Sequence, residues 1–364
     1  MSDFSALEPL GYSPRWHALF AQFEGADTYP ARVVRADRGS VLIASPDGVC
    51  RAKPSTALVK AARGPIDMPA VGDWLAIHAP QGIDVPLVEA VLARTSAITR
   101  GDPGEPSVVQ VLAANVDTVF LVHPIDAEPN LRRIERELSL VWDSGAVPAI
   151  VLTKADASAA PDAPLAAVQG VAIGCDVLVT SAVSGLGVGA LPRYVEDRKT
   201  AVLLGPSGAG KSTLINALLG EYRQETREVR MSDHRGRHTT VVRELIQLPG
   251  GGILIDTPGL RALALTGSDA GIAATFPEIE EAARSCRFRD CTHNDEPGCA
   301  VQAAVESGQL PATRLANYHK LMREAEVAAM KTDVRLRAEE VRKWKSIQKA
   351  AKDFYKHTGK PPQR

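Results

Sequence analysis

The chain of 364 residues is long enough for two or three domains with a sizeable packed core. Hydrophobic residues make up 45% and charged residues 23%, which excludes a disordered chain, a collagen-like repeat and a coiled-coil rod. A membrane helix needs about 20 uninterrupted apolar residues, and no stretch of the sequence approaches that length. Asp3 and Glu8 stand where a signal peptide would be basic, so we expect a cytoplasmic protein without membrane contact.

Charge is unevenly distributed, although the formal net charge is only −1. Residues 331–364 hold eleven Lys and Arg against four Asp and Glu, so this tail is basic while the rest of the chain is acidic. Such a segment is typical of contact with a polyphosphate such as RNA; a solvated basic helix without a partner is the alternative. Helix-forming residues continue to about Tyr355, which predicts a basic helical tail over 331–364.

The first hundred residues divide into two parts. Residues 1–28 show no sustained periodicity and are predicted to form a flexible N-terminal arm. Over residues 29–100, short β-like runs separated by Gly, Pro and Asp predict a small antiparallel barrel. The expected strands are 32–34, 40–43, 74–78 and 86–92.

Residues 101–275 alternate strand-like and helix-like segments after a linker at 101–107 rich in Gly and Pro. This alternation predicts βαβ units around a parallel sheet. A helix is expected at 131–142, where apolar residues recur at helical spacing. The expected strands are 119–122, 147–152, 177–179, 201–204, 245–248 and 253–255.

The strongest motif is GPSGAGKS, which lies directly between the apolar strand 201–204 and a helix-like segment. Its glycines let backbone N–H groups face phosphate oxygens at a helix N-terminus. Lys211 can then reach the β and γ phosphates, and the Ser212 hydroxyl can bind Mg²⁺. A glycine-rich turn with an incidental lysine is the alternative. The predicted phosphate-binding residues are Gly205, Pro206, Ser207, Gly208, Ala209, Gly210, Lys211, Ser212 and Thr213.

Two later segments predict a nucleotide switch. Asp256 ends an apolar strand in the pattern D-x-x-G, so its carboxylate can reach Mg²⁺ through water and the N–H of Gly259 can sense a γ phosphate. The intervening polar loop offers a second hydroxyl for Mg²⁺ from Thr240. Leu260 stands where many GTPases have Gln, so another group must orient the attacking water. His238 is the nearest polar candidate, and a solvated loop histidine is the alternative.

Two segments that precede the glycine-rich loop can recognise guanine, whose N1–H and N2 amino group are both donors. Asp156 can accept from both, and the stem of Lys154 can cover the ring; these residues belong to Thr153-Lys154-Ala155-Asp156. Ser181 and Ala182 can offer backbone N–H groups to guanine O6. In the usual GTPase order these segments follow the glycine-rich loop. A parallel sheet tolerates rejoining of the chain elsewhere, so the order indicates a circular permutation.

A cysteine and histidine cluster with the spacing C-x4-C-x-H-x5-C lies near the end of the chain. Three thiolates and one imidazole complete a tetrahedral set for a structural Zn²⁺, with no position left for a catalytic water. A reduced, buried cysteine cluster is the alternative. The predicted zinc ligands are Cys286, Cys291, His293 and Cys299.

Together these motifs resemble the circularly permuted small ribosomal subunit biogenesis GTPases of the RsgA family. The resemblance runs from about Tyr29 to at least Glu324. It implies an α/β fold: a circularly permuted P-loop GTPase domain over 101–275, preceded by an oligonucleotide-binding (OB) barrel over 29–100 and followed by a helical zinc-binding domain over 276–330. The phrases that carry the resemblance are at 71–74, 114–117, 205–212, 236–240, 256–259 and 286–293.

The family resemblance also implies a function. We expect a monomeric GTP hydrolase that binds the small (30S) ribosomal subunit and its rRNA in late maturation, stimulated by that subunit, with Mg²⁺ accompanying GTP and one structural Zn²⁺. Thr153 stands where the wider GTPase pattern has Asn. The amide that would connect the guanine-recognition segment 153–156 (the base segment) with the glycine-rich loop 205–212 (the P-loop) is therefore missing, and weaker nucleotide affinity is expected. A P-loop ATPase or kinase, and a GTP-dependent RNA-binding scaffold with little hydrolysis, are the alternatives.

Overall fold

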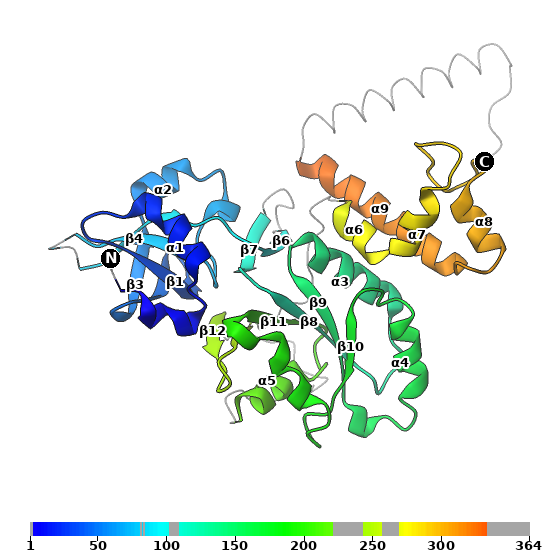
Figure 1. The fold of residues 1–364 in the computed structure, drawn as a ribbon, viewed down its shortest axis with the longest axis horizontal. Coiled ribbons are helices and arrows are strands. Elements are labelled where there is room, and N and C mark those ends of the chain that lie inside the picture. Colours follow the sequence, from blue (N-terminus) through cyan, green and yellow to red (C-terminus); the bar gives the residue numbers. More distant parts are fainter. Residues whose placement is uncertain are drawn as a thin grey trace, which may run out of the picture.

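A computed structural model describes residues 3–80, 82, 84–101, 109–220, 243–256 and 269–332. Figure 1 shows an N-terminal barrel in blue, a central sheet flanked by helices in cyan and green, and a C-terminal group of helices in yellow and orange. Within these residues, no helix combines the length and hydrophobicity needed to span a bilayer.

The barrel closes on itself in the strand order β1-β2-β3-β5-β4-β1, and only the β3–β5 pair is parallel. Its interior is filled by small and branched apolar side chains that alternate along the strands, among them Val33, Ile43 and Ile77. The predicted antiparallel barrel is confirmed. Its elements are β1 (Thr28–Asp37), β2 (Ser40–Ser45), β3 (Gly48–Pro54), α2 (Thr56–Ala61), β4 (Trp74–His78) and β5 (Leu87–Val91).

The N-terminal segment is packed, so the prediction of a flexible arm over 1–28 is wrong. Leu7 and Phe20 are fully buried, and Trp16 stacks at a tilt against Trp74 of the barrel with 5.9 Å between the rings. The buried aromatic side chains fix the segment, while Pro9 interrupts the periodicity that would have revealed it. The segment consists of η1 (Ser5–Leu10), α1 (Pro14–Phe20) and η2 (Ala21–Phe23).

The central sheet has the order β10-β9-β8-β11-β13-β12, in which every pair is parallel except β13–β12. Strands early in the chain occupy one half and later strands the other, and the two halves meet where β8 pairs with β11. This is the permuted order that the sequence predicts. The strands are β8 (Thr118–Pro124), β9 (Val147–Thr153), β10 (Asp176–Val179), β11 (Thr200–Leu204), β12 (Glu244–Gln247) and β13 (Ile253–Asp256).

Helices cover both faces of this sheet. Alternate strand residues such as Leu121 and Leu204 pack on one face with α3 and α4, while Leu203 and its equivalents pack on the other with α5. Because the parallel strands all run in one direction, β8, β9, β11 and β13 end at the same edge. The helices are α3 (Leu131–Asp143), α4 (Asp162–Gln169) and α5 (Lys211–Leu219).

The barrel and the sheet are joined through buried polar contacts. Arg32 of β1 is almost fully buried; its Nη2 donates to Thr200 Oγ1 of β11 at 2.8 Å, and its guanidinium lies 5.4 Å from the Trp74 ring. Burial lowers the pKa of Arg32 to about 10, although Asp117 and Asp73 oppose that shift. A two-stranded hairpin of β6 (Ala97–Gly101) and β7 (Val109–Ala114) connects the two parts, and most of the expected linker lies outside the described residues.

The C-terminal lobe (the zinc lobe, residues 269–332) is helical, as expected for the segment after residue 276. Its core holds Phe276, Ile279, Val301 and Leu321, and α6 lies beside α3 of the central domain (Figure 1). The basic tail lies outside the described residues from 333 onward. The lobe contains α6 (Ala270–Thr275), α7 (Pro277–Ala283), α8 (Ala300–Glu306) and α9 (Ala312–Thr332).

Candidate nucleotide site and metal centre

The glycine-rich loop crosses from the end of β11 to the start of α5. Gly205 has φ +149°, and a Cβ there would lie 2.1 Å from the carbonyl oxygen of Val122 on β8, so only glycine fits. Gly210 precedes the helix in the left-handed conformation, and Lys211, Ser212 and Thr213 form its first turn. Backbone N–H groups in the first turn of a helix point toward its N-terminus, where they can face an anion.

Lys211 reaches back across the loop. Its Nζ donates to the carbonyl oxygens of Gly205 at 2.9 Å and Pro206 at 2.7 Å. The ammonium group therefore sits above the same curl of backbone that the sequence assigns to phosphate. A lysine at this place in such a loop is expected to reach the β and γ phosphates.

Thr153, the last residue of β9, connects the base segment with this loop. Its hydroxyl lies 2.6 Å from the carbonyl oxygen of Ala209 in the P-loop and 3.3 Å from that of His123 on β8. A hydroxyl has one proton, and the shorter distance directs it to Ala209. The expectation that the connection is missing without Asn is therefore wrong, because the threonine hydroxyl makes it.

The two segments assigned to guanine contact each other. Ser181 Oγ donates to Asp156 Oδ1 at 2.5 Å, and the backbone N–H of Ala155 donates to the carbonyl oxygen of Thr180 at 3.2 Å. Ser181 is fully buried, so it fixes the direction of the carboxylate. Ala182 follows directly. Separate strands, β9 and β10, bring the two motifs to one place.

Lys154 is held by a residue that sequence reasoning missed. It adopts φ +59°, and its Nζ lies 3.2 Å from Asp126 Oδ2 in the loop after β8. Both side chains are partly exposed, so the pair contributes little to stability but restricts where the lysine stem lies. The position of Asp126, just beyond an apolar strand, was the available signal.

The residues predicted around Mg²⁺ are only partly described. Asp256 ends β13, which pairs in parallel with β11, so its carboxylate lies at the same edge of the sheet as Ser212. Thr240 and Gly259, together with the proposed catalytic His238, lie outside the described residues.

The cysteine and histidine cluster converges on one point. The four ligand atoms all lie within 4.8 Å of one another. Cys286 Sγ is 3.9 Å from Cys299 Sγ, and His293 Nδ1 is 3.7 and 3.6 Å from these two sulfurs. Zinc bonds of about 2.0–2.3 Å in a tetrahedron separate ligands by about 3.5–3.8 Å. The donor set and its spacing, completed by Cys291, therefore indicate zinc.

Surrounding groups hold the ligands in place. Burial would raise the pKa of Cys286, but backbone N–H groups of Val301 and Ala300 at the start of α8 hold it below its ordinary value, which favours the thiolate that zinc requires. Gln302 Nε2 donates to the carbonyl oxygen of His293 at 2.7 Å. Glu296 accepts from the backbone of Thr292 at 2.8 Å and closes the loop.

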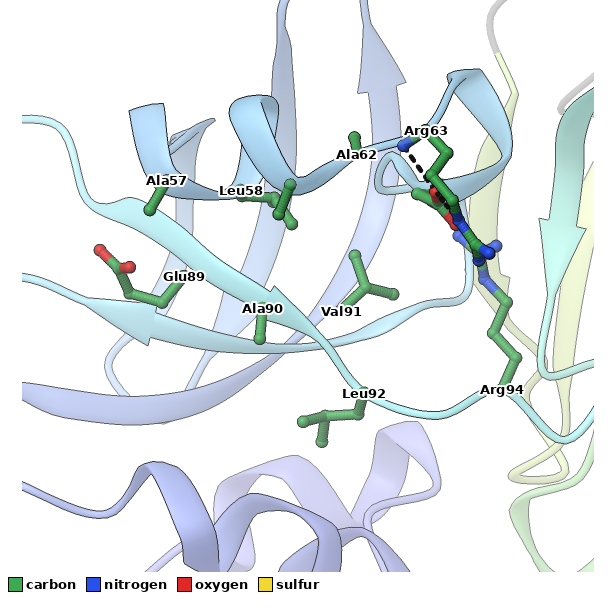
Figure 2. Close-up of a pocket in the computed structure, with 11 residues that line it drawn as sticks. Ala57, Leu58, Ala62, Arg63, Glu89, Ala90, Val91, Leu92 and Arg94 are labelled. Carbon is green, nitrogen blue, oxygen red and sulfur yellow. Dashed lines mark hydrogen bonds and ion pairs between the residues drawn. The ribbon is translucent and has the colours of Figure 1, made fainter.

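A groove of about 600 Å³ lies between α2 and β5 of the barrel (Figure 2). Alanine side chains line much of it, and its charged end is internally paired: Arg63 binds Asp67, and Arg94 makes two 2.8 Å bonds to the buried Asp73. None of the lining residues belongs to the nucleotide or zinc sets, so this groove is separate from both.

Comparison with known proteins agrees with this geometry. A family model described as RsgA GTPase matches residues 91–266, and another described as 50S ribosome-binding GTPase matches residues 200–362. The small ribosomal subunit biogenesis GTPase RsgA of Streptomyces coelicolor is 46% identical over 356 residues, which cover 96% of each chain. The chain belongs to the RsgA family. It is therefore a GTP hydrolase, not a P-loop ATPase or kinase.

Other relatives support the assignment and the permutation. The RsgA protein of Xanthomonas campestris is 42% identical over 343 residues, covering 92% of each chain. The crystal structure of YjeQ from Thermotoga maritima has a TM-score of 0.62 at 25% identity, over 82% of this chain and 98% of that one. The structure of YloQ, described as a circularly permuted GTPase, has a TM-score of 0.56 at 25% identity, over 83% and 96%.

Proposed function

We propose that the chain binds GTP and Mg²⁺ at the carboxyl edge of its central sheet, hydrolyses GTP on the small ribosomal subunit late in its maturation, and thereby times its own release. It acts as a monomer in the cytoplasm. The observation that carries this proposal is the convergence of three separate strand ends. Thr153 contacts Ala209 of the P-loop, and Ser181 contacts Asp156 of the base segment.

Recognition of guanine rests on hydrogen-bond complementarity. The carboxylate of Asp156, oriented by Ser181, accepts from N1–H and the N2 amino group, and adenine offers no matching pair of donors. Lys154 lies over the ring, and the N–H of Ala182 meets O6. The hydroxyl and carboxylate oxygens of Ser212, Thr240 and Asp256 suit Mg²⁺. That ion, when bound, neutralises charge that develops between the β and γ phosphates.

Hydrolysis needs a positioned water, and we assign that task to His238. The water oxygen attacks the γ phosphorus, the bond to the β,γ-bridging oxygen breaks, and GDP and phosphate leave. Lys211 and the N–H groups of the P-loop stabilise the charge on the transferred group. Because the side chain of Leu260 cannot hydrogen bond, a partner that positions His238 against the water is expected to accelerate the reaction.

The RNA-binding role rests on the names of the relatives and on charge. The relatives are named small ribosomal subunit biogenesis GTPases, and this chain carries a barrel, a zinc lobe and a basic tail that can each contact rRNA. Zinc, bound by its four ligands, would hold the short loop of the lobe rigid. The basic tail supplies salt-dependent attraction to phosphates.

The test is GTP turnover with and without isolated small subunits, for the wild type and for His238→Ala. We expect the subunits to accelerate the wild type, and the variant to lose that acceleration while it keeps its affinity for GDP. Absence of stimulation in the wild type would contradict the ribosomal assignment and favour a scaffold with little hydrolysis. Stimulation that persists undiminished in the variant would contradict only the role of His238.

A further inference from the structure

Helix α3 carries a buried carboxylate on the flank that faces the zinc lobe. Glu135 is 1% exposed, and its two oxygens accept from Arg314 Nη1 at 2.7 Å and Asn317 Nδ2 at 2.6 Å, both on α9. These partners are 179 and 182 positions away in the chain. Removal of one partner of such a buried ion pair is strongly destabilising, because it leaves an unpaired buried charge. The pair therefore holds α3 and α9 in one relative position.

Arg314 extends this attachment into the rest of the lobe. Its Nε donates to Glu278 Oε1 at 2.6 Å, its Nη2 donates to the carbonyl oxygen of Thr275 at 2.7 Å, and its guanidinium lies 4.3 Å from the Phe276 ring. Beside it, α6 touches α3 so closely that a Cβ on Gly271 would lie 2.2 Å from the carbonyl oxygen of Ser139. The lobe is therefore docked on α3 through close packing and charge together.

The opposite flank of α3 supports the nucleotide site. Glu137 Oε2 lies 2.8 Å from His123 Nε2, and its Oε1 accepts from Arg133 Nε at 2.7 Å. His123 is buried near the end of β8, and its carbonyl oxygen lies 3.3 Å from the hydroxyl of Thr153, which in turn contacts the P-loop. The carbonyl oxygen of the preceding residue, Val122, is the one that a Cβ on Gly205 would meet at 2.1 Å.

We propose that His123 is a positioning residue for the phosphate loop, and that α3 transmits displacement of the zinc lobe to it through Glu137. Glu135 and Glu137 are two positions apart on a helix that turns about 100° per residue, so they point to opposite sides of one rigid rod. Movement of α3 at one flank must shift the other, because both flanks are close-packed. The inference rests on the proposed assignment of residues 205–212 to the nucleotide.

One consequence is reciprocal. If docking of the lobe against RNA changes the affinity of the P-loop for nucleotide, nucleotide must change the affinity of the lobe for RNA by the same factor. The connection gives the lobe a physical route to the nucleotide site that consists only of contacts between described residues.

The experiment measures the affinity of the full-length zinc-loaded protein for a fluorescent GDP analogue. Glu137→Met removes both bonds of that carboxylate, Glu137→Gln keeps an acceptor for His123, and Glu135→Gln weakens the lobe attachment. Glu324→Gln is the matched control, because Glu324 forms a partly exposed ion pair with Arg136 across the same two helices at 3.1 Å. Zinc content and thermal unfolding report whether each variant folds. Steady-state turnover at varied GTP concentrations gives KM and kcat separately.

We expect Glu137→Met and Glu135→Gln each to weaken GDP binding by between about two- and thirtyfold with kcat less affected, Glu137→Gln to recover part of the loss, and Glu324→Gln to have no effect. In the Glu137→Met background, Glu135→Gln should add little, because the connection is already broken.

Additive losses would overturn the proposal. Gly271→Ala would also overturn it if hydrogen exchange in α6 and α9 becomes faster, which shows that the lobe is loosened, while the affinity for GDP stays unchanged. Lys211→Ala tests the underlying site: if GDP binding survives that change, the assignment of the P-loop fails, not the connection through α3.

Discussion

The contact between Thr153 and the P-loop gives a prediction whose size follows from the structure. In Thr153→Val the shape of the side chain is kept but the hydroxyl is lost, so the carbonyl of Ala209, which is 1% exposed, loses its donor. Leaving a buried acceptor without a partner costs about 1–3 kcal/mol. Because loop opening can admit water, we expect the lower part of that range, which corresponds to GDP binding about five- to thirtyfold weaker.

The assay is titration of a fluorescent GDP analogue against wild type, Thr153→Val and Thr153→Ser. The serine variant keeps the hydroxyl and is expected to bind within about threefold of the wild type, since only a methyl group is removed. Melting temperature and zinc content check that each variant is folded. Equal affinities of the valine variant and the wild type would show that the hydroxyl does not hold the loop, and the reasoning would fail.

Further predictions concern the loop, the zinc lobe and pH. Gly205→Ala places a Cβ 2.1 Å from the carbonyl oxygen of Val122 and should abolish GDP binding, measured by the same titration. Cys291→Ser should release zinc and lower the melting temperature, whereas Cys50→Ser should leave the metal content, measured by elemental analysis, at one zinc per chain. Burial raises the pKa of Glu137, but bonds from His123 and Arg133 hold it below 4.5. The carboxylate therefore contributes its full stabilisation well above its ordinary pKa, and that contribution is lost as pH falls through the lower pKa of the folded protein. Urea unfolding should show that the difference in unfolding free energy between wild type and Glu137→Gln shrinks in acid, and a difference that stays constant would contradict this.

Much of the fold was predictable because its strands are local apolar runs. The stretch 119–122 and the strand before the P-loop are apolar because helices cover both faces of the parallel sheet. Strand β3 escaped prediction because Arg51 and Lys53 face solvent on alternate positions, and the barrel interior receives little more than Ala52 from it. The N-terminal segment escaped because its burial depends on the distant Trp74.

The site was predictable where chemistry is encoded by contiguous residues. The P-loop and the cysteine spacing are local patterns with a physical reason for each position. The contacts of His123 with Glu137 and of Arg314 with Glu135 join residues 14 and 179 positions apart, so no local pattern reveals them. The contact that Thr153 makes in place of Asn is hidden from the sequence for the same reason: its nearest acceptor is the carbonyl of Ala209 in the P-loop, 56 positions away, which only the folded sheet brings close.

The most direct test of the central claim is the base preference of Asp156→Asn. The claim is that scattered strand ends enclose one guanine nucleotide, with this carboxylate on its N1 and N2 groups. An asparagine side chain offers one acceptor and one donor, which matches xanthine, where a carbonyl replaces the amino group. We predict that competition binding and turnover will show a large loss of affinity for GTP and a gain for XTP. A variant that still prefers GTP over XTP would contradict the account.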